Sequence, residues 1–317
     1  MEKIMSEHQP TWDEPRMPAP NLIRTAQDEE QALWAIKSNR KPVIILSDFD
    51  NTLCDTSTFD PKTNDHSPLL DAELVKLATK KPLVVATGRR ANHTWLPTMW
   101  TSGLVHPVIP IIAENGGVLN VLHQDGLVEH ALLAPTDQIN DLKVWATDIA
   151  VQHQTELGKK VAIKQGLSAL VMRVQNEAGE SPRQDQRTLL QFLGSAGLPE
   201  AFVAIHSGNS LTLQPKGIDK ARAFHEVLDG LGIERSEIQV IGVGDSANDE
   251  AIFEESDVSV GVHFDVAHLV DIAGLRGVET TKLLLGFPFQ TRAVNFDEFA
   301  SYSATIGATI AKERPRS

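Results

Sequence analysis

Polar segments that follow three separate apolar stretches contain the residue types that bind cations and anions. They comprise Asp48 and Asp50, then Thr87, Gly88 and Arg89, and then Asp245, Asn248 and Asp249. Because the carboxyl ends of parallel strands meet at one edge of a sheet, we expect these residues to lie together. Clustered carboxylates repel one another unless a cation compensates for them, and Mg²⁺ prefers oxygen ligands. The pattern therefore predicts a Mg²⁺ site, and the metal would offset the negative field that an incoming phosphate meets.

Alternating strands and helices are predicted to hold these segments at one sheet edge. The first strand, 43–46, is a continuous apolar run of the kind that is buried on both faces of a parallel sheet. Further strands are predicted at 83–86, 108–113, 240–243 and 258–262, with helices at 27–37, 69–80, 91–100, 219–231 and 295–312. Such alternation is typical of right-handed parallel crossovers. The predicted fold class is therefore α/β, with a Rossmann-like parallel sheet as its core.

This alternation is interrupted between about 136 and 213, where the order helix, strand, strand occurs twice. The predicted helices span 137–154 and 182–193, and the predicted strand pairs span 161–164 with 169–174 and 202–206 with 210–213. A further hairpin is indicated at 118–121 and 127–131. We therefore predict an N-terminal extension over 1–40, a core domain over 41–117 and 214–317, and an inserted α+β domain over 118–213.

The composition and net charge of the chain argue against some classes of binding partner. The 317-residue chain is 41% hydrophobic and 22% charged, which is ordinary for a globular protein, and its formal net charge is −13. This charge argues against nucleic acid or an anionic membrane surface as a partner, because both would be repelled. The single cysteine, Cys54, excludes an internal disulfide, and neither a secretory leader nor a membrane-spanning run is evident. We therefore expect a cytoplasmic protein that acts on a small molecule.

The order of five motifs resembles that of the haloacid dehalogenase superfamily, in the branch whose α+β cap is inserted after the third strand. This branch includes the Cof-type and sucrose-phosphatase-like enzymes. The matching motifs are Asp48-x-Asp50-x-Thr52, Thr87-Gly88-Arg89, Glu114-Asn115-Gly116, Lys216-Gly217-Ile218-Asp219-Lys220 and Gly244-Asp245-x-x-Asn248-Asp249. One departure is Asn51, where many members have glycine. The resemblance extends over residues 43–262 and includes the position of the insertion.

The resemblance implies a role for each motif. Asp48 would attack phosphorus to form an aspartyl phosphate, and Asp50 would protonate the leaving oxygen and later activate water. Lys220, rather than Lys216, would stabilise charge on the transferring group. The residues that would bind the phosphate are Thr87, Gly88, Arg89, Asn115 and Asn248, and those that would hold Mg²⁺ are Asp48, Asp50 through its carbonyl, Asp245 and Asp249. The implied function is that of a Mg²⁺-dependent phosphomonoesterase acting on a small, sugar-phosphate-like metabolite.

Three alternatives are weighed against this function. A phosphomutase would use the same fold and the same motif residues. Gly242-x-Gly244-x-x-Ala247 fits a relaxed dinucleotide-binding fingerprint, with Asp265 about 20 residues on, and would indicate a dinucleotide-dependent oxidoreductase. Against that reading, Asp245 would lie where the pyrophosphate approaches. A non-catalytic phosphate-binding regulator is disfavoured because the nucleophile, the acid/base, the lysine and the metal-binding acids are all present.

The inserted domain is predicted to select the substrate. Every residue with an implied chemical role lies outside it, yet both of its connections leave from the predicted active edge of the sheet. From there it would close over the site and exclude water. Candidate polar groups for the leaving group are Arg173, His206 and Asn209.

Overall fold

The computed structural model describes residues 22–23, 41–50, 52–53, 82–93, 96–134, 136–176, 179–207, 210–245 and 247–261. Several sequence predictions lie outside these residues. They are the helices at 27–37, 69–80 and 295–312, nearly all of the extension 1–40, and the positions Asn51, Cys54 and Asn209.

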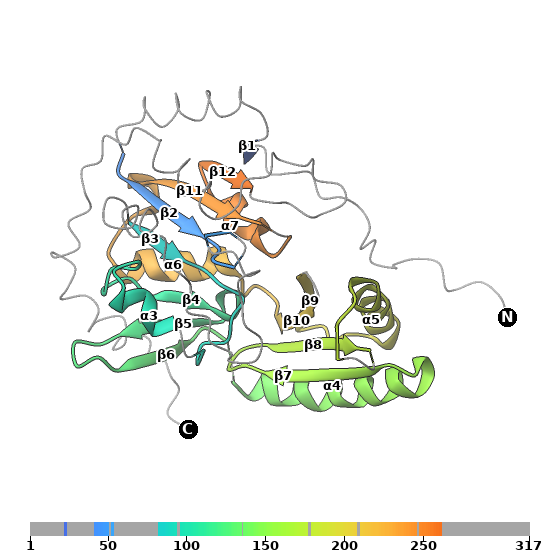
Figure 1. Cartoon of the computed structure of the whole chain (residues 1–317). Coiled ribbons are helices and arrows are strands. Elements are labelled where there is room, and N and C mark those ends of the chain that lie inside the picture. Colours follow the sequence, from blue (N-terminus) through green and yellow to red (C-terminus); the bar gives the residue numbers. More distant parts are fainter. Residues whose placement is uncertain are drawn as a thin grey trace.

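Five parallel strands form the central sheet of the core, in the order β1-β12-β11-β2-β3 (Figure 1). Their bounds are β1 Leu22–Ile23, β2 Val43–Ser47, β3 Leu83–Val85, β11 Gln239–Gly244 and β12 Val258–Gly261. Strand β2 lies between β11 and β3, and all of its residues are buried, as the apolar run predicted. The polar segments that follow β2, β3 and β11 therefore leave from three adjacent strands.

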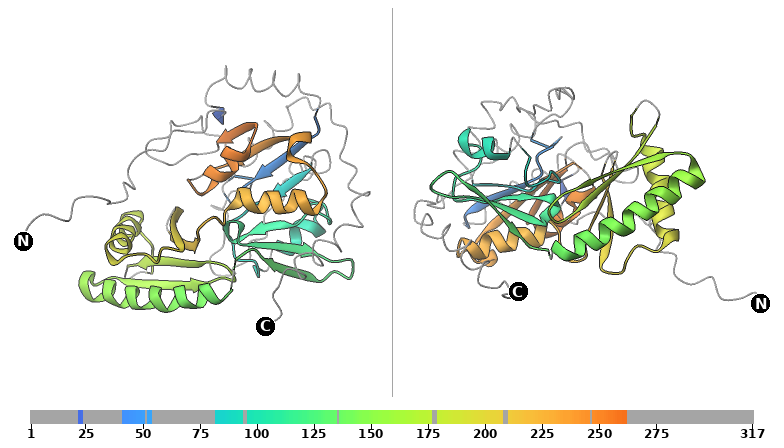
Figure 2. Two further views of the ribbon diagram at one scale, coloured as in Figure 1. Left: turned by 180° about the vertical axis from the view of Figure 1, so that it is seen from behind. Right: turned by 90° about the horizontal axis from the view of Figure 1, so that it is seen from below.

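Helices α3, Leu96–Thr101, and α6, Lys220–Gly230, lie on opposite faces of this sheet (Figure 2). Helix α6 begins at Lys220 because the Asp219 carboxylate accepts a hydrogen bond from the Arg222 amide at 2.8 Å, which caps the helix. Its apolar residues recur at helical spacing and are buried against the core; they are Ala223, Phe224, Val227 and Leu228. The short helix α7, Glu250–Glu255, packs against α6 and β11.

A three-stranded antiparallel sheet extends the core beyond β3. It consists of β4 Ile111–Ala113, β5 Val118–Leu122 and β6 Val128–Leu132. A parallel bridge between Ile112 of β4 and Ala86, the residue after β3, connects this sheet to the central sheet. Val118, Leu119 and Ala131 belong to the same hydrophobic cluster as the central sheet. The predicted boundary at 118 assigned this hairpin to the insertion, whereas its pairing and packing place it with the core.

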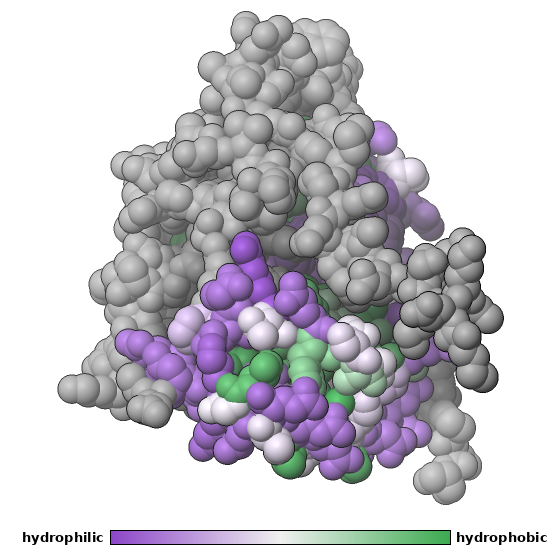
Figure 3. All heavy atoms as spheres, turned by 90° about the vertical axis from the view of Figure 1, so that its right-hand side faces the viewer, coloured by the Kyte–Doolittle hydropathy of each residue, from purple (hydrophilic) through white to green (hydrophobic). Residues whose placement is uncertain are grey.

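The inserted module consists of one layer of helices packed on one antiparallel sheet. We call it the cap module and define it as residues 136–215. Its antiparallel sheet has the order β7-β8-β10-β9, and helices α4 and α5 pack on one face of that sheet around a second hydrophobic cluster (Figure 1). The bounds are α4 Thr136–Leu157, β7 Lys160–Gln165, β8 Leu170–Gln175, α5 Arg183–Ala196, β9 Phe202–Ser207 and β10 Ser210–Pro215. The predicted repeat of helix, strand, strand is confirmed. The end of the module seen in Figure 3 is mostly hydrophilic, with a smaller hydrophobic group at its middle.

Two elements begin three or more residues later than the sequence predicted. The helix expected at 91–100 begins at Leu96, and the strand expected at 108–113 begins at Ile111. Proline explains both shifts, because Pro97 favours the first turn of a helix and Pro110 has no amide hydrogen for strand pairing. Three short 3-10 turns complete the described elements: η2 Glu114–Gly116, η3 Arg235–Glu237 and η4 Ala247–Asp249. Among the described residues, no helix is both long and apolar enough to cross a membrane.

Candidate active site

A buried lysine joins two buried aspartates at the carboxyl edge of the central sheet. Asp48 follows β2 directly, and its amide donates to the Val243 carbonyl of the neighbouring strand β11 at 2.9 Å. The Lys220 ammonium donates to Asp48 Oδ1 at 2.7 Å and to Asp249 Oδ1 at 2.6 Å. The side chains of Asp48, Lys220 and Asp249 are 6%, 1% and 0% exposed, so these ion pairs are shielded from water. The three residues come from positions up to 201 apart in the sequence, yet they form one charged cluster.

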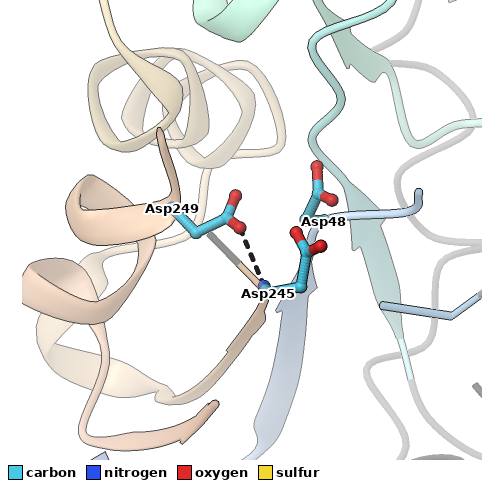
Figure 4. A group of neighbouring side chains, drawn as sticks. All are labelled: Asp48, Asp245 and Asp249. Atoms are coloured by element: carbon cyan, nitrogen blue, oxygen red, sulfur yellow. Dashed lines mark hydrogen bonds between the residues drawn. The ribbon is translucent and has the colours of Figure 1, made fainter. Parts of the chain in front are cut away.

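Asp48, Asp245 and Asp249 form the group of carboxylates that could hold a metal ion (Figure 4). One carboxylate oxygen from each lies within 4.8 Å of the others. The Asp249 Oδ2 atom also accepts the Asp245 amide at 2.9 Å, and its other oxygen is bound to Lys220. Asp249 therefore holds Lys220 and the loop after β11 in place, while the carboxylates of Asp48 and Asp245 lie next to each other.

Burial and neighbouring charges shift the pKa values of Asp48 and Lys220 in this cluster. Burial raises the pKa of the Asp48 carboxyl well above its ordinary value, and the Asp249 carboxylate adds to this, while the Lys220 ammonium opposes it. Burial alone would lower the pKa of Lys220, but the carboxylates of Asp249 and Asp48 outweigh burial and raise it. Lys220 therefore stays protonated, and its single charge is bound by the Asp48 and Asp249 carboxylates, with the Asp245 carboxylate close to both. Oxygen ligands with excess negative charge are the donor set that Mg²⁺ prefers.

Asp50 lies beside this cluster and is held by a different cation. The Arg89 Nε atom donates to both Asp50 carboxylate oxygens, at 3.0 and 2.8 Å, and Arg89 Nη2 donates to Oδ1 as well. The Thr87 hydroxyl donates to Asp50 Oδ2 at 3.3 Å and accepts the Arg89 amide at 3.1 Å. The sequence assigned Arg89 and Thr87 to the phosphate, and the structure places both against the predicted acid/base residue. The Asp50 side chain is not part of the metal-compatible group.

The remaining predicted phosphate-binding residues line the same edge. Asn248 Nδ2 donates to Asn115 Oδ1 at 3.4 Å, which connects the loop after β11 to the turn after β4. A Cβ atom at Gly88 would lie 3.0 Å from Asn115 Oδ1, so a small residue suits this position. The structure therefore brings every predicted site residue to one edge of the sheet, whereas Lys216 is exposed.

Two glycines permit the close approaches on which the cluster depends. Gly116 has φ +100°, and a Cβ atom there would lie 1.9 Å from the Asp219 carbonyl oxygen. The start of α6, and with it Lys220, can approach this turn only because the side chain is absent. At Gly244 a Cβ atom would lie 2.4 Å from the Asp249 Cβ atom, so this glycine admits Asp249 behind the loop.

Glu114 belongs to one of the sequence motifs, but the sequence indicated no role for it. Its side chain is 2% exposed and accepts the Ala91 amide at 3.1 Å. It also accepts the amides of Leu167 and Ser168, at 3.0 and 2.7 Å, and the Ser168 hydroxyl at 3.0 Å. Leu167 and Ser168 form the turn between β7 and β8, so Glu114 fastens the cap module to the core. Its place directly after a strand, like that of Asp48, was the available signal.

Comparison with known proteins finds a family similarity in one part of the chain and a similar fold in solved structures. Residues 183–273 match the sequence model of a haloacid dehalogenase-like hydrolase family. The search of curated proteins found no match to this sequence. Among solved structures, the C-terminal domain of trehalose-6-phosphate phosphatase from C. albicans has a TM-score of 0.56 at 16% identity, covering 85% of this chain and 97% of that one.

Two further solved structures have the same fold. A protein of Thermoplasma acidophilum has a TM-score of 0.51 at 17% identity, covering 78% of this chain and 99% of that one. An IMP-bound mutant of Plasmodium falciparum IMP-nucleotidase has a TM-score of 0.55 at 11% identity, covering 81% of this chain and 69% of that one. At these identities the likeness establishes the fold, and the family match and the order of the motifs agree with it. Residues 183–273 are therefore similar to the haloacid dehalogenase-like hydrolases, and the described part of the chain has the fold of these solved structures.

Proposed function

We propose that this protein is a Mg²⁺-dependent phosphomonoesterase that hydrolyses a small phosphorylated metabolite, with a sugar phosphate as the expected substrate class. The observation that carries the proposal is the Asp48 carboxylate, buried and bound to Lys220 at 2.7 Å, with Asp50 two residues away on a separate cation. Two relatives in fold are named for small phosphorylated compounds, trehalose-6-phosphate phosphatase and IMP-nucleotidase. These names support the substrate class, and the site supports the chemistry.

The proposed reaction has two steps at Asp48. In the first, an Asp48 oxygen attacks phosphorus, the bond from phosphorus to the leaving oxygen breaks, and Asp50 gives that oxygen a proton. In the second, Asp50 takes a proton from water, the water oxygen attacks phosphorus, and the Asp48 carboxylate is released with inorganic phosphate. Lys220 holds Asp48 in one orientation and places a positive charge beside the transferring group. Arg89 orients the Asp50 carboxylate for both proton transfers.

The residues present fit a bound Mg²⁺ ion. Asp48, Asp245 and Asp249 each offer one carboxylate oxygen, and these oxygens lie within 4.8 Å of one another. When bound there, Mg²⁺ would neutralise charge on the carboxylates and on the incoming phosphate. The Asp249 oxygens are already engaged by Lys220 and the Asp245 amide, so we assign Asp249 to holding these groups in place.

The dinucleotide alternative has little support from the geometry. The space in front of Gly244, where the fingerprint would admit a pyrophosphate, is occupied by the Asp249 side chain. The helix that follows, α7, spans only six residues, Glu250–Glu255, and begins with an acidic residue. Both features oppose an anion at this loop.

The test is a screen of the purified full chain against a panel of phosphorylated metabolites, with and without Mg²⁺. Phosphomonoesterase activity predicts release of inorganic phosphate that requires Mg²⁺ and is lost in Asp48→Asn. A phosphomutase would instead convert one sugar phosphate into its isomer without releasing phosphate. Oxidoreductase activity would change the absorbance of NAD(P)H, which is monitored in the same wells. Phosphate release that persists in Asp48→Asn would refute the proposed nucleophile.

A further inference from the structure

The cap sheet has one face covered by helices and one face directed at the active edge. Along β8, Leu170, Met172 and Val174 belong to the hydrophobic cluster beneath α4 and α5. Since side chains alternate along a strand, Val171 and Arg173 lie on the opposite face. A crevice between the cap module and the core is lined by Val171 and Thr212 from this face; its lining on the core side includes Gly88, Arg90 and Glu114.

Arg173 is a half-buried cation on this face, two residues along β8 from the crevice. Its Nε atom is buried and has no hydrogen-bond partner, and among the described residues no carboxylate forms an ion pair with it. Burial lowers the pKa of Arg173, and the nearby Arg89 guanidinium lowers it further. The charge of Arg89 is itself neutralised by Asp50, so no described acid compensates Arg173.

A half-buried guanidinium without a partner is costly, because the desolvation of its donors is not repaid by hydrogen bonds. The partner that would remove this cost is an anion in the crevice. Guanidinium groups bind carboxylate and phosphate through two parallel hydrogen bonds, which gives both affinity and orientation.

We propose that Arg173 determines specificity by binding a second anionic group, a carboxylate or a further phosphate, on the leaving group of the substrate. This inference rests on the proposed phosphatase function. The transferring phosphate is bound at Asp48 in the core, and Arg173 contacts the substrate from the opposite side of the crevice, on the cap module. Arg173 therefore acts on the leaving group, and substrates with an anionic leaving group are preferred.

The test uses two esters that differ by one group, 3-phosphoglycerate and glycerol 3-phosphate, with 4-nitrophenyl phosphate as a third substrate. The measured quantity is the ratio of kcat/KM for 3-phosphoglycerate to that for glycerol 3-phosphate. In Arg173→Gln this ratio is expected to fall about 10- to 100-fold, the loss typical of a charge-assisted hydrogen bond. Arg173→Lys should restore part of it. Arg187→Gln, at an exposed arginine of α5 on the other side of the cap sheet, should leave the ratio unchanged.

The outcomes separate this inference from the proposed function. If the wild-type protein releases no phosphate from any of the three esters with Mg²⁺ present, the phosphatase proposal itself fails. If phosphate is released and Arg173→Gln keeps the wild-type ratio, only the role of Arg173 is refuted. An equal loss on all three esters would show that Arg173 binds the transferring phosphate instead. Should only 4-nitrophenyl phosphate be hydrolysed, the same ratio is obtained from the inhibition constants of the other two esters.

Discussion

Removing the buried cation should destabilise the fold as well as stop catalysis. Lys220 is 1% exposed and is bound to Asp48 and Asp249. Lys220→Met keeps the length of the side chain but leaves these two carboxylates buried without their cation. We expect the free energy of unfolding to fall by about 3–5 kcal/mol, the usual cost of breaking a buried ion pair from one side. Lys216→Met is the matched control. Lys216 is exposed, so this substitution should lower the free energy of unfolding by less than about 0.5 kcal/mol.

The loss of folding stability in Lys220→Met should become smaller as the pH falls. Burial raises the pKa of Asp48 and the Lys220 ammonium opposes this rise, so removing Lys220 raises that pKa further, and the Asp48 carboxyl binds a proton more readily in the folded variant than in the folded wild-type chain. Lowering the pH therefore favours the folded state of the variant, and the loss of stability should shrink as the pH falls. Removing one of the two carboxylates should act in the same way, so Lys220→Met/Asp249→Asn should be more stable than Lys220→Met alone.

Urea unfolding followed by circular dichroism, in the presence of a chelator, measures these differences without a contribution from bound metal. Turnover of 4-nitrophenyl phosphate with Mg²⁺ gives the catalytic effect, which should be a loss of about 100- to 1,000-fold for Lys220→Met. The reasoning would be refuted if Lys220→Met and Lys216→Met unfolded at the same urea concentration. Equal stability of Lys220→Met/Asp249→Asn and Lys220→Met would contradict the expectation that the two carboxylates destabilise the fold once Lys220 is removed.

The remaining predictions concern the other parts of the site. Asp48→Asn should lose turnover while its circular dichroism spectrum is unchanged, since the amide oxygen can still accept from Lys220; near-normal turnover would exclude a covalent mechanism. Asp50→Asn should accumulate phosphate on Asp48 with an activated ester, and rapid-quench mass spectrometry that finds none would contradict the division of roles. Gly116→Ala should lower the urea midpoint and turnover together, because the new Cβ atom would meet the Asp219 carbonyl oxygen. The control is Gly103→Ala, where φ is +78° and the space is open, so that only backbone strain is added. Equal urea midpoints for the two variants would contradict this expectation.

The strands of the core and the placement of its acids could be predicted from the sequence. Residues 43–46 are all apolar, which indicates a strand buried on both faces, and the structure places this strand between two parallel neighbours. Once the strands are parallel and adjacent, the residues that follow them must share an edge. This is why Asp48 and Asp245, separated by almost two hundred residues, could be expected in one cluster.

Side-chain pairing across the fold could not be predicted in the same way. Arg89 was assigned to the phosphate, yet it binds Asp50, a choice that depends on the orientation of two loops rather than on spacing. The hairpin of β5 and β6 has the same local pattern as a cap hairpin, and only its pairing with β4 places it in the core. The role of Glu114 depends on a turn more than fifty residues later that no local pattern connects to it.

The turn after β4 unites these features, because three successive residues serve three different parts of the molecule. Glu114 and Asn115 have φ of +52° and +53°, a conformation that costs non-glycine residues about 1–3 kcal/mol each. Hydrogen bonds from both domains to the Glu114 carboxylate offset this strain. The same backbone directs Asn115 toward Asn248 and leaves room at Gly116 for the start of α6. One strained turn therefore contacts both the cap module, through Glu114, and the start of the helix that carries Lys220, through Gly116.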